Sequence, residues 1–290
     1  MKTSLGLIGV GMMGVGIAAN LVRHGFPLHL LEHPGNQPIG ELLAAGAQRC
    51  ATPRELAARV DVLLICVTGS PQVEAVLTGP EGALPGLRPG SIVIDLSTAI
   101  PSSTERMAAA VQAAGSGFLD AAMTRTPKEA AEGRLNLLVG GDAALLERVR
   151  PVLDSFAENI FHAGPVGSGH RMKLLHNFVS LGLVTLISEA AACASQSGIA
   201  PEVFVDVLAR GGGGGIALER LKPFLLEGNV GALRFSVANA CKDLGYYRTM
   251  ADQTGADRTI AEAVLATLTE AAQSNPDALV PELARLIAQR

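Results

Sequence analysis

Short apolar runs alternate with helical stretches through the first 160 residues, and this alternation restricts the fold more than any other feature. The apolar runs, such as LGLIG and DVLLICV, are continuous rather than alternating in polarity. Strands of this kind are covered on both faces, as in a parallel sheet with helices on each side. We therefore predict an α/β fold with a doubly wound parallel sheet. The predicted strands span residues 5–9, 27–32, 61–67, 91–97, 118–123, 135–140 and 159–163.

The strand signals stop at the segment GPVGSGHR, which begins at residue 164. A long helix is predicted at about 171–197, and further helical stretches follow to the end of the chain. We therefore predict two domains, an α/β domain over 1–163 and an all-α domain over 164–290. The apolar stretch 178–194 approaches a membrane span in composition, but it carries Glu189 and several hydroxyl side chains. It is predicted to be a buried helix, and no membrane partner is expected.

Composition excludes several other classes. The net charge is −4 and no run of Lys or Arg is present, so no nucleic-acid partner is expected. The four cysteines have no close spacing, which argues against a metal site or a disulfide framework and favours a reducing cytoplasm. Residues 1–21 have an early Lys and an apolar middle, as a signal peptide does, but their many glycines make a poor apolar helix. We expect no targeting segment.

Three glycines with the spacing G-x-G-x-x-G follow the first predicted strand. They are Gly9, Gly11 and Gly14, and they open a predicted helix. In this context the first glycine permits a tight turn, the second lets a pyrophosphate approach the backbone, and the third lets helix and strand pack closely. The helix N-terminus offers N–H groups to the phosphates. We predict a dinucleotide site that includes Met12 and Met13; the alternative is that these glycines only pack the turn.

The second predicted strand ends at Glu32, eighteen residues after Gly14. An acid at this place accepts hydrogen bonds from the ribose 2′-OH and repels a 2′-phosphate. The next residues are His33 and Pro34 rather than an arginine that would bind a 2′-phosphate. The sequence therefore favours NAD over NADP.

Four polar side chains share one face of the long predicted helix. Lys173, His176, Asn177 and Ser180 follow i, i+3, i+4, i+7 spacing, and their neighbours are largely Leu, Phe and Val. A stripe facing solvent would explain a lone lysine, but four different hydrogen-bonding groups favour a cleft between the two domains. A partly desolvated lysine can exchange a proton with a substrate hydroxyl or carbonyl.

Several segments together resemble the β-hydroxyacid dehydrogenase family, which includes 3-hydroxyisobutyrate dehydrogenase and tartronate semialdehyde reductase. The segments are GLIGVGMMGVGIAANL, DLSTAIPSST, EGRLNLLVGG, GHRMKLLHN and KDLG. The resemblance implies a Rossmann domain, a linking helix and an all-α domain, with Lys173 as general acid/base and Asn177 beside it on the substrate. It also implies that the cofactor is lined by Val67, Thr68 and Thr98 and is reached by Lys242. We further expect a homodimer or homotetramer.

The chain departs from the family at the segment DAAMTRT, where members usually carry DAPVSGG. Thr124 keeps a hydroxyl at the serine position, while Arg125 and Thr126 replace two glycines. A similar Gly-Arg-Thr segment in sulfolactaldehyde reductase helps to hold a sulfonate, and a guanidinium offers two parallel donors to such an anion. We predict that Arg125 contacts an anionic substrate; the alternative is a solvated turn. A second departure is His176, where asparagine is usual, and it either touches substrate or packs beside Lys173.

These observations predict an oxidoreductase that transfers a hydride between NAD and a small β-hydroxy acid or related anionic hydroxy compound. An imine reductase is one alternative, although such relatives lack the lysine found at position 173. A cofactor-binding module without catalysis is the other, and the presence of Lys173 and Asn177 also argues against it.

Overall fold

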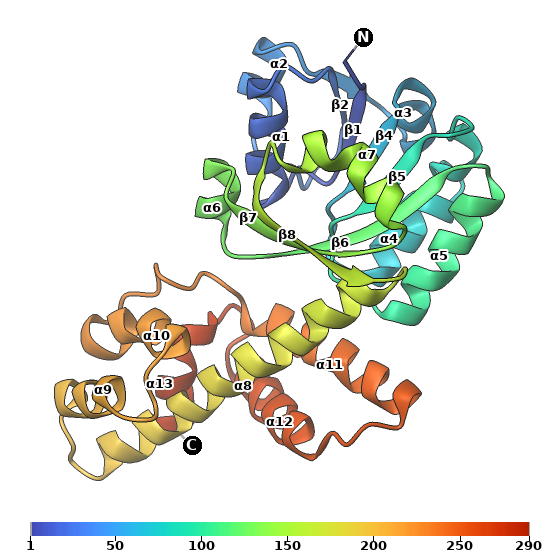
Figure 1. The fold of residues 1–290 in the computed structure, drawn as a ribbon. Helices are drawn as coiled ribbons and strands as arrows, with labels where there is room; N and C mark the ends of the chain where they lie inside the picture. The colour runs from blue at the N-terminus through green and yellow to red at the C-terminus, as the bar shows by residue number, and fades with distance from the viewer. Residues whose placement is uncertain (1, 290) are drawn as a thin grey trace. The chain divides into compact units, whose positions relative to one another are not determined.

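The computed structural model describes residues 2–289, which form two compact units (Figure 1). The first unit runs to Lys173 and the second begins at Leu174, so the division falls inside one long helix. The predicted fold class is confirmed: a mostly parallel sheet flanked by helices is followed by a helical region.

The first unit contains one eight-stranded sheet in the order β3-β2-β1-β4-β5-β6-β7-β8. Its strands are β1 (Leu5–Ile8), β2 (Leu28–Leu31), β3 (Gln48–Cys50), β4 (Val62–Ile65), β5 (Ile92–Asp95), β6 (Gly117–Thr124), β7 (Leu135–Gly140) and β8 (Ala157–Gly164). Every predicted strand is present. The strand β3 was not predicted, because two of its three residues are exposed and it carries no apolar run.

The prediction of a parallel sheet needs one correction. The strands from β3 to β6 are parallel, but β7 pairs with β6 in the antiparallel direction, and β8 is parallel to β7. Residues 125–134 alone connect β6 to β7. A crossover that returns the chain in the same direction needs a dozen or more residues, so this short connection makes a reversal.

Helices cover both faces of the sheet, as the continuous apolar strands predicted. In β4, Val62 and Leu64 belong to one buried cluster, whereas Leu63 and Ile65 belong to another on the opposite face. The first cluster is completed by α1 and α7, and the second by α3, α4 and α5. The helices of this unit are α1 (Gly14–Arg23), α2 (Gly40–Ala44), α3 (Pro53–Arg59), α4 (Ser70–Thr78), α5 (Pro101–Ala113), α6 (Pro127–Glu132) and α7 (Ala143–Leu153).

Helix α8 (Ser168–Gln196) begins in the first unit and continues through the second. The remaining helices of the second unit are α9 (Pro201–Arg210), α10 (Ile216–Glu227), α11 (Val237–Thr254), α12 (Thr259–Ser274) and α13 (Leu283–Ala288). Among the described residues α8 alone has the length and composition of a membrane span, with a mean hydropathy of 1.7, a criterion that core helices of soluble proteins also meet.

The burial of α8 is one-sided rather than complete. Leu181 and Val184 are buried in the core of the second unit, whereas Val179 and Leu186 are exposed. The predicted buried helix is therefore correct for one face only. The expectation of a homodimer or homotetramer stays a prediction.

The connection between β6 and β7 begins with an unusual backbone. Arg125 has φ +81°, and it is the one non-glycine residue with positive φ between residues 2 and 289. Thr126 then caps α6, with its hydroxyl and N–H both donating to the Glu129 carboxylate. These hydrogen bonds, the one from the hydroxyl above all, lower the pKa of Glu129.

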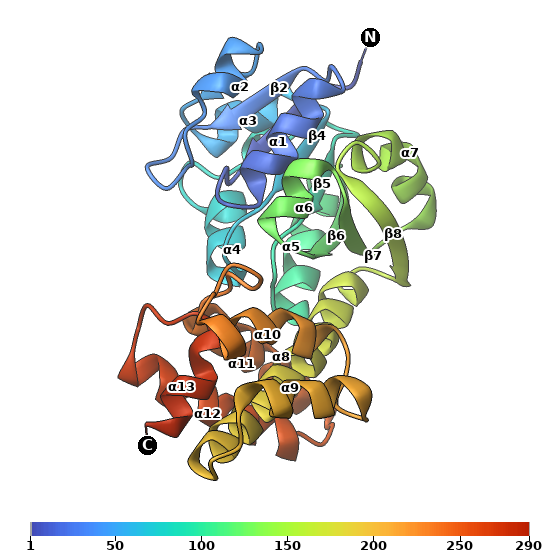
Figure 2. The ribbon, with the colours of Figure 1, turned by 90° about the vertical axis from the view of Figure 1, so that its left-hand side faces the viewer.

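A buried asparagine fixes this connection to α1, and Figure 2 shows α6 beside that helix. Asn20 is almost fully buried, and its Nδ2 donates to the carbonyls of Gly16 and Ala130, each at 2.9 Å. Gly16 permits the close approach, because a Cβ there would lie 2.7 Å from the backbone carbon of Ala130. The turn at Arg125 is thus attached to the helix that follows the glycine motif.

Replacing Asn20 with Ala should lower the free energy of unfolding by about 1–3 kcal/mol, since buried carbonyls lose their donor. Chemical denaturation would measure the loss. Gln112, exposed on α5, is the matched control, and Gln112→Ala should change stability by less than about 0.5 kcal/mol. Equal stability of the two variants would contradict the assigned role of Asn20.

The backbone at Arg125 can be tested by comparing two variants that both lack the side chain. Arg125→Gly should be more stable than Arg125→Ala by about 1 kcal/mol, because only glycine adopts this φ without strain. At Ala109, an exposed position inside α5, substitution by Gly should instead cost about 0.5–1 kcal/mol. An Ala variant at 125 that matches or exceeds the Gly variant in stability would show that no such strain exists.

Candidate active site

The glycine turn between β1 and α1 fits the predicted dinucleotide site. Gly9 has φ +95°, and a Cβ there would lie 2.1 Å from the Cys66 carbonyl oxygen. A Cβ at Gly14 would lie 2.0 Å from the Gly9 carbonyl oxygen, so both glycines are required by packing. A Cβ at Gly11 would meet no atom within 4 Å. Packing alone therefore does not explain Gly11, and the open space beside it suits a pyrophosphate.

The two methionines of the motif are placed differently from one another. Met12 is exposed at the turn, whereas Met13 precedes α1 and packs against the core of the first unit. Asn36, which sequence analysis missed, ties the following loop to this turn: its Oδ1 accepts from the Val10 N–H at 3.3 Å and its Nδ2 donates to the Leu31 carbonyl at 2.9 Å.

Glu32 follows β2 directly, as the sequence predicted, and its carboxylate has a partner from the neighbouring strand. Arg49 Nη1 of β3 lies 3.0 Å from Glu32 Oε1, and both side chains are about half exposed. Arg49 was not considered in the sequence analysis, because β3 was not recognised. Its position matters for cofactor choice, since an arginine at this place can also bind a 2′-phosphate.

The predicted cofactor-lining residues of β4 and β5 meet at the same edge of the sheet. Val67 and Thr68 follow β4, Thr98 follows β5, and these two strands are neighbours. The Val67 N–H donates to Ser97 Oγ at 3.0 Å, which fixes one of the two turns to the other. Parallel strands present ligand sites at their carboxyl ends, and β1 with its glycine turn lies next to β4. The structure thus brings this predicted group together.

A buried polar cluster lies beneath these turns. Asp95, Asp120 and His170 are fully buried, although they come from β5, β6 and the first turn of α8. Burial raises the pKa of Asp95 above its usual range, while the nearby His170 ring acts in the opposite direction. Burial, together with the charge of Asp95, raises the pKa of the Cys66 thiol to about 12. Cys66 is therefore a neutral thiol at physiological pH and is no nucleophile.

The predicted substrate segment lies at the end of β6. Thr124 is buried, and its Oγ1 accepts from Asn136 Nδ2 at 3.1 Å. Arg125 directs one guanidinium nitrogen, Nη1, to both the Glu158 carboxylate and the Arg134 carbonyl oxygen. The structure gives Thr126 a capping role in α6, and the predicted contact of Thr126 with substrate stays a prediction.

The four predicted polar residues all lie on α8, as their spacing required. Lys173 is the last residue of the first unit and is partly buried. In the second unit, His176 Nδ1 lies 3.1 Å from Asn177 Oδ1, so the ring nitrogen is the donor. Ser180, one turn further on, is partly buried.

A buried carboxylate that the sequence did not reveal holds Asn177. Asn177 Nδ2 donates to Asp243 Oδ2 at 2.6 Å, and Asp243 Oδ1 lies 3.2 Å from Lys242 Nζ. Lys242 Nζ also lies 5.7 Å from the centre of the Tyr246 ring. Within the second unit, therefore, Lys242 and Asn177 share one partner. The adjacency of Lys242 and Asp243 in KDLG was a signal that could have suggested it.

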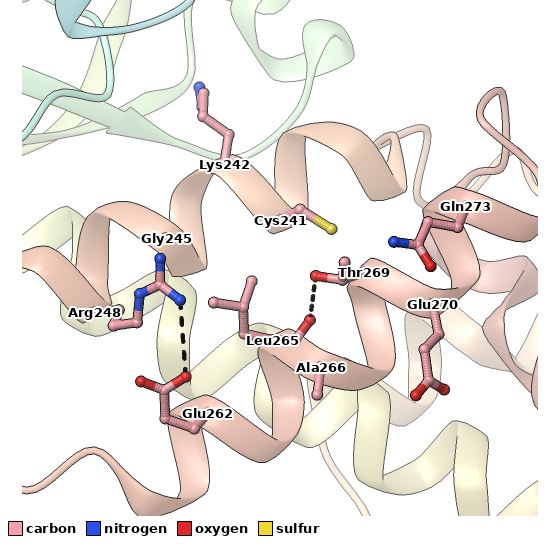
Figure 3. A pocket seen from close by; sticks show the side chains of 10 residues that line it. All are labelled: Cys241, Lys242, Gly245, Arg248, Glu262, Leu265, Ala266, Thr269, Glu270 and Gln273. Atoms are coloured by element: carbon pink, nitrogen blue, oxygen red, sulfur yellow. Dashed lines mark hydrogen bonds and ion pairs between the residues drawn. The ribbon is translucent and has the colours of Figure 1, made fainter.

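A groove of about 640 Å³ lies between α11 and α12, and Figure 3 shows its lining. Cys241 of α11 and Thr269 of α12 line it from facing helices, and Arg248 forms an ion pair with Glu262 across the two helices. Among the predicted site residues only Lys242 borders it. Over residues 2–289 no group of three metal-ligating side chains occurs, and the expectation of no metal site rests on the sequence argument.

Comparisons with known proteins agree with this geometry. Residues 4–164 match the NAD-binding domain of 6-phosphogluconate dehydrogenase, and residues 167–286 match the NAD-binding domain of NADP-dependent 3-hydroxyisobutyrate dehydrogenase. The chain is 34% identical to the NAD-dependent L-serine dehydrogenase of Pseudomonas aeruginosa, over 76% of this chain and 74% of the relative. It is 31% identical to the 3-sulfolactaldehyde reductase of Escherichia coli, over 86% and 84%.

A solved structure is similar over nearly the whole chain. The 3-hydroxyisobutyrate dehydrogenase of Mycobacterium tuberculosis with L-serine superposes with a TM-score of 0.88 at 27% identity, covering 98% of this chain and 99% of that one. The resemblance inferred from the sequence motifs is confirmed. The chain belongs to the β-hydroxyacid dehydrogenase family and is an NAD(P)-binding oxidoreductase that acts on CH–OH groups.

Proposed function

We propose that the protein interconverts a small anionic β-hydroxy acid with its aldehyde or ketone, with NAD as the cofactor and Lys173 as general acid/base. The observation that carries this proposal is the place of Lys173. It lies three residues after His170, whose ring is buried beside Asp95 at the carboxyl end of β5. The glycine turn and Val67, Thr68 and Thr98 lie at that same edge of the sheet.

Each residue type suits a separate part of the reaction. When bound, the nicotinamide supplies or accepts the hydride. The Lys173 amino group takes the hydroxyl proton during oxidation and returns it during reduction. Asn177, one helical turn later, can orient the substrate oxygen, because its own amide is fixed by Asp243. We assign Thr124, Thr126, His176 and Ser180 to the surroundings of the substrate on the same grounds as in the sequence analysis.

The first test replaces Lys173 with Ala. NAD should bind nearly as tightly as before, whereas kcat should fall on the order of 10²–10⁴-fold, as expected for a lost general acid/base. Isothermal titration would measure the binding of NAD, and NADH absorbance the turnover. Lys222 of α10 offers a matched control, and Lys222→Ala should leave kcat unchanged. A Lys173→Ala variant with wild-type kcat would refute the assignment of Lys173.

Cofactor choice is proposed to depend on the pair formed by Glu32 and Arg49. While paired, Glu32 offers its second carboxylate oxygen to a ribose hydroxyl and keeps the Arg49 charge neutralised. Once Glu32 is removed, Arg49 becomes available to a 2′-phosphate. This arrangement supports NAD as the preferred cofactor, with a latent site for NADP.

The second test compares Glu32→Ala with the double variant Glu32→Ala/Arg49→Ala. The single variant should raise KM for NAD roughly 10-fold, as for a lost charge-assisted hydrogen bond, and should lower KM for NADP. The double variant should not show this lower KM for NADP, because it also lacks the Arg49 guanidinium that would bind the 2′-phosphate. Steady-state kinetics with both cofactors would measure this. A wild-type enzyme that already prefers NADP would overturn the role given to Glu32.

Arg125 is proposed to hold the anionic group of the substrate. Its Nη1 is used by Glu158 and by the Arg134 carbonyl, but within residues 2–289 its Nε and Nη2 make no hydrogen bond. These two nitrogens form one edge of the guanidinium, which is suited to a carboxylate, sulfonate or phosphate. The relation to 3-sulfolactaldehyde reductase supports an anion of this kind.

The third test measures kcat and KM for Arg125→Gly and Arg125→Lys. The Gly variant should raise KM much more than it lowers kcat, with a loss in kcat/KM of roughly 10- to 150-fold for one charge-assisted contact. The Lys variant keeps the positive charge but cannot donate two parallel hydrogen bonds, so it should retain only part of the kcat/KM that the Gly variant loses. The nearby Arg134→Ala is the control, since Arg125 contacts only the backbone carbonyl of Arg134, whose side chain pairs with Glu132. Unchanged kinetics in both Arg125 variants would mean that Arg125 is only a turn residue.

A further inference from the structure

A continuous chain of contacts joins the turn after β4 to the start of α8. The Val67 N–H donates to Ser97 Oγ at 3.0 Å, and the Ser97 N–H donates to Asp95 Oδ1 at 2.9 Å. The other carboxylate oxygen, Asp95 Oδ2, lies 3.9 Å from His170 Nε2. None of the proposed catalytic contacts uses Asp95 or His170.

Two facing polar atoms in this chain are buried without a hydrogen bond. They are Asp95 Oδ2 and His170 Nε2, and both side chains have no exposed surface. Buried polar groups that lack partners cost free energy, so their retention calls for an explanation. The 3.9 Å between these two atoms is too long for a hydrogen bond, but it is within the distance of an ion pair between a carboxylate and an imidazolium ring.

The other ring nitrogen of His170 is fixed. His170 Nδ1 lies 2.7 Å from Thr104 Oγ1, and that hydroxyl also lies 3.2 Å from the Ile100 carbonyl that it can donate to. The imidazole therefore donates from Nδ1 to Thr104, and Nε2 is left for Asp95. The backbone is fixed as well, because the His170 N–H donates to Asp120 Oδ2 at 2.8 Å.

The consequence concerns the residue one turn further along α8. Residues three apart lie on neighbouring positions of a helix, so contacts that hold His170 in place also restrict where the Lys173 side chain can lie. We propose that His170, through Asp95, is a positioning residue that aligns Lys173 with the cofactor-lining turn after β4. This inference rests on the role of Lys173 proposed above.

The test compares Gln and Asn at position 170, whose side-chain amides lie at different distances from the backbone. Gln at position 170 extends as far as His Nε2 and can contact Asp95, whereas Asn extends only as far as Nδ1 and can contact Thr104 alone. His170→Gln should keep kcat within about 3-fold of wild type. His170→Asn and His170→Leu should lower kcat about 10- to 100-fold, the range expected for a reacting group displaced by about 1 Å. KM for the substrate and the affinity for NAD should change by less than about 3-fold in all three.

A second measurement needs no turnover. Amide hydrogen exchange over the first turns of α8 should be faster in His170→Asn than in His170→Gln, since only the Gln side chain can contact Asp95 in addition to the backbone contacts with Asp120 that all the variants keep. The exposed His162 of β8 supplies the control, and His162→Leu should alter neither kcat nor this exchange. If the Leu variant does not fold, the comparison of Gln with Asn decides the question.

The outcomes separate this inference from the proposed function. Equal kcat and equal exchange in the Gln and Asn variants would overturn it, as would a loss that appears in KM alone. If Lys173→Ala keeps wild-type kcat, the role of Lys173 fails by that result, and the exchange measurement still shows whether His170 fixes α8. If Lys173→Ala loses activity while the Asn variant keeps it, only the positioning role fails.

Discussion

The carboxylate of Asp120 holds the start of α8 on the sheet, and the arrangement of the candidate site depends on this contact. Its two oxygens accept the N–H groups of Gly167 and His170, at 2.7 and 2.8 Å, where the helix begins. A buried carboxylate is stable here because the N-terminus of a helix carries unpaired donors and a partial positive charge. Gly169 lets the helix approach, since a Cβ there would lie 2.2 Å from the Leu138 carbonyl oxygen. Lys173 follows within one turn and so has a fixed relation to the sheet.

The predicted substrate segment carries a charged side chain on a backbone of the kind that glycine prefers. Arg125 has a positive φ of the kind that glycine adopts readily, at a position where the family resemblance led us to expect glycine. The strain is small, and the ion pair with Glu158 is partly exposed and therefore weak. Binding of a substrate anion to the Arg125 guanidinium would therefore cost little free energy from the loss of this ion pair. Substrate choice is accordingly expected to depend on Arg125.

Much of the fold could be predicted because local patterns carry it. Continuous apolar runs marked seven of the strands, and the glycine spacing marked the turn before α1. Strand direction could not be predicted in the same way, since an apolar run is the same in either direction; the reversal at β7 follows from the short connection after Arg125. The three residues of β3 were too few and too exposed to recognise.

For the candidate site, local sequence patterns predicted even less than they did for the fold. Spacing predicted that Lys173 and Asn177 lie on one helix, as they do in α8, but the partners of the candidate site residues come from distant parts of the chain. Asp243 reaches Asn177 from α11, and Glu158 reaches Arg125 from β8. The ion pair of Glu32 with Arg49 likewise joins the residue after β2 to β3. Contacts of this kind depend on tertiary structure, and a single sequence gives no periodic signal for them.

Direct hydride transfer from a hydroxy acid tests the central claim most directly. Wild-type protein with NAD would be assayed against three- and four-carbon β-hydroxy acids, including carboxylates and sulfonates, each carrying deuterium on the carbinol carbon. The account predicts that at least one anionic substrate is oxidised and that its deuterium appears in the reduced cofactor by mass spectrometry. Tight binding of NAD without oxidation of any of these compounds, or turnover in which the deuterium is lost to water, would contradict it.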